Sequence, residues 1–433
     1  MLVVPEWRGQ GVRRDLDARA EEAAGLARAI ALDIRHVQLL RLRQTRAATL
    51  IGVGQIEALV PIIAQNAVEL VVIDAALTAI QQRNLETALG TKVIDRTGLI
   101  LEIFGERAAT AEGRLQVELA HLDYQSGRLV RSWTHLERQR GGFGFLGGPG
   151  ETQIEADRRM IRDRMARIRK QLDEARRTRG LQRGRRQKAP WPVIALVGYT
   201  NAGKSTLFNR LTHSDVMAAD MLFATLDPTM REIRLPEIDK AILSDTVGFV
   251  SDLPTQLIAA FRATLEEVTT ADLIAHVRDM SHPDSEAQYE DVRTILADLG
   301  VTGQVVHGDG EGADPIPQIE LWNKIDRCDP DLRALLEQRA AARDDVVIVS
   351  ALTGEGVQRA LRAVSTRLTR DHQGRRLSLA AEQGDALAWL HAHGRVVKQT
   401  SDAAGTAEVE ARLSPSDWAR FAQHWPEVSL QPL

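Results

Sequence analysis

The segment from Gly198 to Ser205 has the residue types and spacing of a loop that wraps nucleotide phosphates. It fits the pattern G-x-x-x-x-G-K-S/T, and the apolar run from Val193 to Val197 predicts the buried strand that should precede such a loop. Glycines let backbone N–H groups close around a phosphate, and the start of a following helix adds positive partial charge. We expect Lys204 to reach the β- and γ-phosphates and Ser205 to give its hydroxyl to Mg²⁺. The residues predicted to contact the nucleotide here are Gly198, Tyr199, Thr200, Asn201, Ala202, Gly203, Lys204, Ser205 and Thr206.

A second motif, D-x-x-G, begins at Asp245 after another apolar run. A carboxylate at the carboxyl end of a strand beside a phosphate loop can hold Mg²⁺ through a water, and the Gly248 amide can contact the γ-phosphate. Between the two motifs, a threonine can complete the Mg²⁺ shell; Thr225 is the expected ligand and Thr229 the alternative. We expect nucleotide contacts from Phe223, Ala224, Thr225, Leu226, Asp227, Asp245, Thr246, Val247 and Gly248, with Ser205 and Thr225 as metal ligands.

A third motif, N-K-x-D, predicts a guanine site. Asp326 can accept both N–H donors on the edge of guanine, which adenine lacks, and a wrong base would leave the carboxylate unpaired. A further apolar run ends in Ser-Ala-Leu, whose backbone N–H can bind the guanine carbonyl. An ATP-using kinase or motor is the competing enzyme class, and N-K-x-D argues against it. The expected base contacts are Asn323, Lys324, Ile325, Asp326, Ser350, Ala351 and Leu352.

The residue after D-x-x-G is Phe249, where Ras-like switches carry the glutamine that orients the attacking water. A phenyl ring has no hydrogen bond to give, so we expect slow hydrolysis by the protein alone. We assign no catalytic residue firmly, apart from Lys204 for transition-state charge. Asp252 or Gln256 could supply the missing group instead.

The phrases GYTNAGKST, LFATLDPT, DTVGF and NKID, with the upstream run GGPGETQIEADRR, resemble the HflX GTPases of bacteria. The resemblance extends from about Val37 to the C-terminus and is most specific over residues 110–280. It implies GTP and GDP as ligands, binding to the large ribosomal subunit, splitting or rescue of stalled ribosomes, and hydrolysis that the ribosome stimulates. The resemblance also leaves open ATP use by the N-terminal half, but residues 1–109 contain no phosphate-loop motif. An RNA-binding assembly factor that uses GTP as a timer is the alternative function.

Residues 110–188 predict two long helices, because apolar residues recur at steps of three and four on both sides of a Gly-rich connection. Within them, residues 158–190 hold 14 Lys and Arg against 3 Asp and Glu, a net +11 in a chain of net −4. This charge favours contact with a nucleic-acid backbone, and a solvated linker is the alternative. In the resembling family the connection, residues 140–150, reaches into the RNA-rich centre of the ribosome; a merely flexible turn is the alternative.

The order of segments predicts an α/β fold: a P-loop GTPase domain with an N-terminal α/β subdomain, a helical hairpin and a small C-terminal α+β domain. Apolar runs fall short of the roughly 18 residues that a membrane span requires, and the first residues lack the order of a signal peptide. We therefore expect a cytoplasmic protein. Separately, we expect a monomer. His276 should be structural and Arg278 should be exposed at a strand end. The expected domains are 1–109, 110–188, 191–370 and 375–433.

Overall fold

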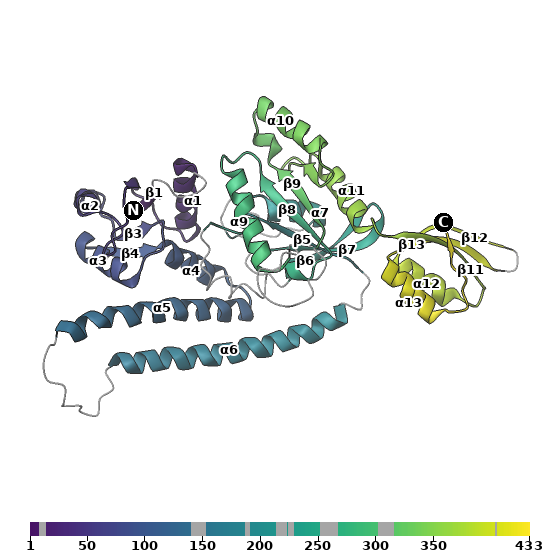
Figure 1. Ribbon diagram of the computed structural model, residues 1–433, viewed down its shortest axis with the longest axis horizontal. Coiled ribbons are helices and arrows are strands. Elements are labelled where there is room, and N and C mark those ends of the chain that lie inside the picture. Colours follow the sequence, from purple (N-terminus) through teal and green to yellow (C-terminus); the bar gives the residue numbers. More distant parts are fainter. Residues whose placement is uncertain are drawn as a thin grey trace.

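The computed structural model describes residues 1–7, 14–139, 153–186, 191–213, 223, 229–251, 267–301, 316–402 and 405–433. The strands in these ranges form three sheets that succeed one another along the chain. Figure 1 shows the sheets side by side, with two long antiparallel helices passing along one side of the first two. The architecture is mixed α/β, as the sequence predicts.

The first sheet is parallel, in the order β2-β1-β3-β4. Its strands are short and apolar, which is typical of parallel sheets covered by helices. Apolar patterning in the sequence predicts strands at 37–43, 68–73 and 91–94 and helices at 55–65 and 78–89. Strands β2 to β4 and helices α2 and α3 fall there, whereas the patterning does not predict β1, α1 and α4. The elements are β1 (Leu2–Trp7), α1 (Leu16–Ala29), β2 (Val37–Leu42), α2 (Val53–Gln65), β3 (Leu70–Ile73), α3 (Ala79–Leu89), β4 (Lys92–Asp95) and α4 (Arg96–Arg107).

The central sheet has the order β10-β9-β8-β5-β7-β6, and only its edge strand β6 is antiparallel. The carboxyl ends of the parallel strands therefore meet at one edge, where ligands bind in such sheets. The elements are β5 (Val193–Gly198), α7 (Lys204–Thr212), β6 (Thr229–Leu235), β7 (Ile238–Asp245), β8 (Leu273–Asp279), α9 (Ser285–Asp298), β9 (Gln318–Asn323), η1 (Ile325–Arg327), α10 (Pro330–Ala341), β10 (Val346–Ile348) and α11 (Val357–Leu368).

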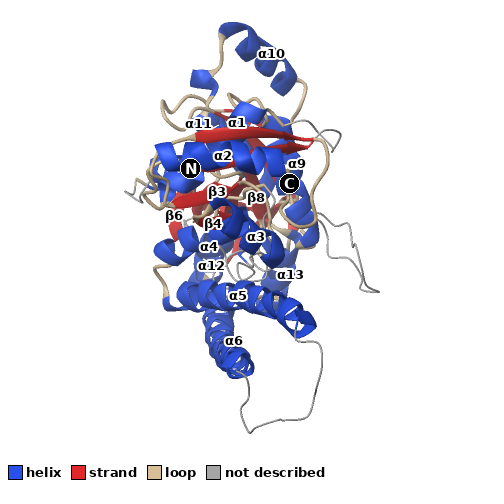
Figure 2. Cartoon of the chain, turned by 90° about the vertical axis from the view of Figure 1, so that its left-hand side faces the viewer, coloured by secondary structure: helices blue, strands red, loops and turns tan. Residues whose placement is uncertain are grey.

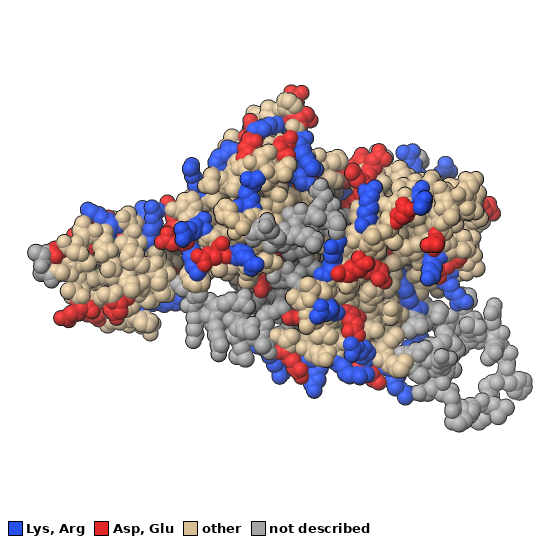
Figure 3. Space-filling model, turned by 180° about the vertical axis from the view of Figure 1, so that it is seen from behind, with Lys and Arg blue, Asp and Glu red and all other residues tan. Residues whose placement is uncertain are grey.

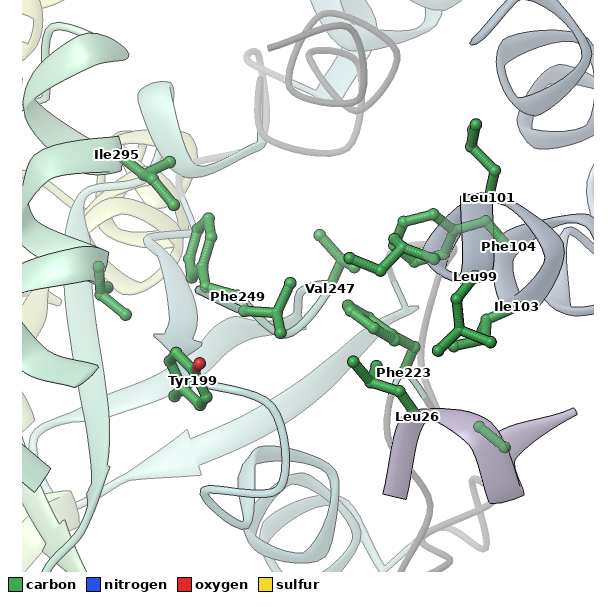
Figure 4. Close-up of a cluster of buried hydrophobic side chains, with 14 of the residues drawn as sticks. Leu26, Leu99, Leu101, Ile103, Phe104, Tyr199, Phe223, Val247, Phe249 and Ile295 are labelled. Carbon is green, nitrogen blue, oxygen red and sulfur yellow. The ribbon is translucent and has the colours of Figure 1, made fainter. Parts of the chain in front are cut away.

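One hydrophobic cluster joins the first sheet to the central sheet. Figure 4 shows Leu26 and Phe104 from the N-terminal region beside Phe223, Val247 and Phe249 from the nucleotide-binding region. Phe104 and Phe249 are both at most 1% exposed. Burying a phenylalanine side chain contributes roughly 1.5–3 kcal/mol, so this shared cluster fixes the first sheet against the residues that follow β7.

The helical hairpin consists of α5 (Ala111–Gln139) and α6 (Gln153–Arg186), which pack against each other. Met165, Ile168 and Leu172 of the predicted apolar stripe on α6 are buried. Figure 2 shows the pair below the sheets, with α5 nearer to them than α6. The Gly-rich connection lies outside the described residues. Among the helices that are described, none is long and apolar enough to cross a membrane.

The last sheet is antiparallel, in the order β12-β13-β11-β14, with two helices packed on it. Trp418 and Phe421 fill its core, and Trp389 and Trp425 pack partly buried against them. Ser414 caps α13 by accepting a hydrogen bond from the Asp417 amide, as the Ser-Pro-Ser pattern predicts. The elements are β11 (Gln373–Leu379), α12 (Gly384–His393), β12 (Arg395–Ser401), β13 (Ala407–Leu413), α13 (Pro415–His424) and β14 (Gln431–Pro432).

Candidate guanine-nucleotide site

The predicted phosphate loop connects β5 to α7 at the carboxyl edge of the central sheet. Gly198 and Gly203 are required by space as well as by conformation. A Cβ on Gly198 would lie 2.2 Å from the Val277 carbonyl oxygen, and one on Gly203 would lie 2.2 Å from Nδ2 of Asn323. Gly203 also has a φ of +95°, in the region that favours glycine. The loop is thus shaped by strand β8 on one side and the N-K-x-D motif on the other.

Lys204 lies inside this loop. Its Nζ donates to the carbonyl oxygens of Gly198 at 3.0 Å and Tyr199 at 2.8 Å, and the residue is only 6% exposed. Burial lowers the pKa of Lys204 to about 8, and the nearby Asp245 carboxylate opposes that shift. An ammonium held here is ready to pair with the negative charge of a phosphate.

The two residues predicted to hold Mg²⁺ near α7 and β7 are in contact. The Ser205 hydroxyl donates to Oδ2 of Asp245 at 2.8 Å, although the two are 40 positions apart. A hydroxyl and a carboxylate are the oxygen donors that Mg²⁺ prefers, so this donor set fits the ion once phosphate and water oxygens complete its shell. Among the described residues, no group of three or more His, Cys, Asp and Glu could hold a metal alone. Thr225 lies outside them, as do Ala224, Leu226 and Asp227.

The D-x-x-G segment is bonded directly to the phosphate loop. The Thr200 amide donates to the Phe249 carbonyl at 2.6 Å, and the Phe249 amide donates to the Gly198 carbonyl at 3.1 Å. Thr246 is buried and donates its hydroxyl to the Leu196 carbonyl at 2.6 Å. Phe249, which stands in the position of the Ras-like glutamine, is therefore a core residue. It has no polar side-chain group to offer a phosphate or an attacking water.

The predicted base motifs also converge. Asn323 joins three segments, since its Nδ2 donates to the Ala202 carbonyl at 2.7 Å and its Oδ1 accepts from the Ala351 amide at 2.9 Å. The Ser350 hydroxyl donates to Oδ1 of Asp326 at 2.5 Å, which orients that carboxylate. Asp326 and Leu352 are exposed at the edge of the sheet, where a base could reach them.

Comparison with known proteins gives the family. A protein named GTPase HflX from Magnetococcus marinus is 50% identical over 89% of this chain and 86% of its own length. The chain belongs to the HflX family of GTPases. Another GTPase HflX, from Escherichia coli, is 40% identical over 87% of this chain and 85% of its own. A solved GTP-binding protein from Sulfolobus solfataricus with GDP is a more distant likeness, with 22% identity, a TM-score of 0.43 and coverage of 85% of this chain and 98% of its own.

Four family models match successive parts of this HflX chain. They are described as GTP-binding GTPase N-terminal over residues 17–105, GTP-binding GTPase Middle Region over 107–186, 50S ribosome-binding GTPase over 193–305 and HflX C-terminal domain over 335–425. The third match contains the phosphate loop and D-x-x-G, whereas N-K-x-D and the Ser-Ala-Leu segment lie beyond its end.

Arg210 and Asp279 lie outside the predicted motifs but contact residues expected to bind the base. Sequence reasoning did not identify them. The Arg210 guanidinium on α7 donates to the carbonyl oxygens of Ala351, at 2.6 Å, and Leu352. Asp279, at the end of β8, forms an ion pair with Nζ of Lys324 at 2.8 Å. Asp279 ends a strand next to β9, and that position at the sheet edge is the signal that could have identified it.

Arg278 corrects a prediction. It is 7% exposed, not exposed at a strand end, because Oε2 of Glu320 on the neighbouring strand accepts from it at 2.8 Å. Its guanidinium also lies 4.2 Å from the centre of the Tyr289 ring. His276 is buried beside it and stacks on the same ring, and burial lowers the pKa of His276 to about 3. Both residues serve packing between β8, β9 and α9.

Proposed function

We propose that this chain is a Mg²⁺-dependent GTPase that binds the large ribosomal subunit and uses the nucleotide state to split stalled ribosomes. Lys204 would hold the β- and γ-phosphates, Ser205 and Asp245 would hold Mg²⁺ directly or through water, and Asp326 would select guanine. Mg²⁺ would neutralise charge that develops between the β- and γ-phosphates. The observation that carries the proposal is the convergence of these separated motifs at one sheet edge.

We infer that hydrolysis by the protein alone is slow. The Phe249 ring is 1% exposed and lies in the cluster shared with the N-terminal sheet, so it cannot orient a water. A partner that orders the site would then accelerate the reaction, as arginine fingers do for other GTPases. The ribosome is the expected partner because a family model that matches residues 193–305 is described as a 50S ribosome-binding GTPase.

The hairpin is the expected contact with ribosomal RNA. Seven basic side chains along the described part of α6 are exposed: Arg159, Arg162, Arg164, Arg167, Arg169, Lys170 and Arg177. Figure 3 shows basic side chains, with acidic ones between them, along the lower edge of the molecule, where the hairpin lies. Exposed Arg and Lys bind phosphate backbones by releasing counterions, so this face suits RNA and its binding should weaken with salt.

The test is sedimentation with separated large subunits under GDP, GTP and a non-hydrolysable GTP analogue, followed by light scattering of 70S particles. We expect tighter subunit binding with the analogue, a decrease in scattering when GTP is added, and hydrolysis at least tenfold faster with large subunits than without them. Binding without loss of 70S scattering would favour the assembly factor that uses GTP as a timer. Equal hydrolysis rates with and without subunits would contradict the proposal.

A further inference from the structure

We propose that Arg96 is a positioning residue for GTP hydrolysis, and that the Asp95–Arg96 pair links the helical hairpin to the segment after D-x-x-G. The proposal rests on the nucleotide site proposed above and adds a regulatory connection to it. Asp95 is the N-cap of α4 and Arg96 is its first residue. Neighbours in the chain thus face two different parts of the molecule.

Arg96 forms hydrogen bonds with the segment that follows Gly248, the glycine expected to contact the γ-phosphate. Its Nη2 donates to the Ser251 hydroxyl at 2.8 Å and to the Ser251 carbonyl at 3.2 Å, and its Nε donates to the same carbonyl at 3.3 Å. Ser251 is three positions after Gly248. Arg96 is 5% exposed and also pairs with Asp74 and Glu22, so the buried charge is fully partnered.

The phosphate loop belongs to the same network. The Tyr199 hydroxyl donates to Oε2 of Glu22 at 2.8 Å and accepts from the Ser251 amide at 2.7 Å. Glu22 therefore accepts hydrogen bonds from both Arg96 and Tyr199. Ser251 is likewise hydrogen-bonded to Arg96 and to Tyr199. This closed ring of bonds holds the phosphate loop and the segment after D-x-x-G in one arrangement relative to α1 and α4.

Asp95 holds the hairpin in a similar way. Its Oδ1 accepts from the Tyr124 hydroxyl at 2.5 Å, and its Oδ2 accepts from Nη2 of Arg128 at 2.9 Å. Both partners lie on α5. Gly98 leaves room for this contact, because a Cβ there would lie 2.6 Å from the Tyr124 hydroxyl oxygen. The Arg128 guanidinium also lies 3.3 Å from the centre of the Tyr124 ring, which orients both side chains.

A movement of α5 would therefore reach Ser251 through the first turn of α4, which Asp95 and Arg96 begin. Asp95 is 1% exposed and its carboxylate also accepts from the Gly98 amide, so the start of α4 cannot follow α5 without carrying Arg96 with it. Two sites joined through such an element bias each other reciprocally. An α5 displaced by a partner on the hairpin would shift Ser251, and a γ-phosphate beside Gly248 would shift α5.

The test uses purified protein and fluorescent GDP and GTP-analogue titrations. The variants are Arg96→Lys, Tyr124→Phe and the double variant, with Arg19→Lys as the matched control, because Arg19 also pairs with Asp74, at 3.0 Å, but has no contact with Ser251. We expect the ratio of GDP to GTP-analogue dissociation constants to change at least threefold in Arg96→Lys and at least twofold in Tyr124→Phe, in the same direction. The double variant should change no more than the larger single variant, and the control should match wild type.

A kinetic measurement separates positioning from simple support of the fold. At saturating GTP, Arg96→Lys should lower kcat at least threefold while KM stays within twofold of wild type. An unchanged nucleotide ratio and unchanged kcat in Arg96→Lys, together with a lower unfolding temperature, would show that Arg96 only stabilises the fold. Changes that multiply in the double variant would show two independent effects and overturn the link. Wild-type protein that binds neither nucleotide would overturn the proposed nucleotide site itself, whichever ratios the variants give.

Discussion

The Phe223 ring meets the Phe104 ring edge-on, with centroids 4.6 Å apart and planes inclined at 69°. Phe223 lies two positions before Thr225, the threonine predicted to bind Mg²⁺. Phe104 belongs to helix α4, which follows the last strand of the N-terminal sheet. A residue from the segment expected to respond to the γ-phosphate is therefore 3% exposed in a core shared by two sheets. Each nucleotide state must either keep this contact or disrupt it.

Replacing Phe104 with leucine should change how the protein distinguishes GTP from GDP. The substitution removes an edge-to-face pair worth about 0.5–1.5 kcal/mol, together with part of the packing around Phe223. We expect a lower free energy of unfolding and an altered ratio of GTP-analogue to GDP affinity, measured by urea denaturation and fluorescence titration. Phe421→Leu is the matched control, since it removes similar volume from the C-terminal core. An equal change of the ratio in both variants would contradict the role of Phe104.

Nucleotide affinity should depend on pH through Lys204. Burial lowers its pKa to about 8, and a bound phosphate should raise that pKa because negative charge favours the ammonium. Below pH 8 the lysine is charged in both states and affinity is constant. Above pH 8 binding must take up a proton, so the GDP dissociation constant should rise by up to about tenfold per pH unit. Titrations from pH 6.5 to 9.0 test this, and a Lys204→Met variant, although weaker in binding, should lose the dependence.

Base preference should follow Asp326. Asparagine at this position presents one N–H₂ group and one oxygen, which suits xanthine better than guanine. We expect Asp326→Asn to weaken GTP binding at least tenfold and to favour xanthosine triphosphate, measured by competition titration. Asp331→Asn, on the nearby first turn of α10, should bind as wild type does. Unchanged GTP affinity in Asp326→Asn would remove guanine from this position.

Asp279 should slow nucleotide release without affecting the preference for guanine. Its carboxylate holds the Lys324 ammonium at 2.8 Å and is itself anchored by the Ser281 amide and hydroxyl, at 3.0 and 2.6 Å. Removing the charge should free the lysine chain beside the base, at a cost of about 1 kcal/mol for a partly exposed pair. We expect GDP to dissociate roughly fivefold faster from Asp279→Asn in stopped-flow fluorescence, with the GTP-to-XTP preference retained. No acceleration, or the same acceleration in a Lys324→Met background, would contradict this mechanism.

The hairpin connection can be tested by shortening residues 141–148. The segment is remote in sequence from the nucleotide motifs, so GDP and GTP affinity should be retained. Loss of ribosome splitting in light scattering is the expected result, because the proposal assigns contact with ribosomal RNA to the hairpin. Undiminished splitting by a variant that binds nucleotide normally would argue against a role for the connection.

The nucleotide motifs could be predicted because each is a short run whose chemistry is local, and strands of a parallel sheet bring such runs to one edge. Arg210 could not be predicted in the same way. Its partners are 141 and 142 positions away, and only the packing of α7 against the loop after β10 brings them together. Arg278 was mispredicted because a charge within an apolar strand is acceptable when the next strand supplies Glu320 beside it.

The N-terminal sheet could be predicted only in part. Strands β2 to β4 have apolar runs flanked by helices with recognisable patterns, and they were expected. Helix α4 was not, although its start carries the Asp95 and Arg96 contacts, because their partners on α5 and after β7 are set by tertiary packing. The sequence therefore identifies the residues expected to bind the nucleotide more readily than those that connect them to the rest of the molecule.

The hydrophobic cluster shared by the first two sheets also determines how the chain unfolds. Neither sheet can lose its packing there without exposing apolar surface of the other, so heating should melt both together as one cooperative unit. The C-terminal sheet has a separate core and should give its own calorimetric transition. Truncations between residues 109 and 191 would then leave halves that aggregate.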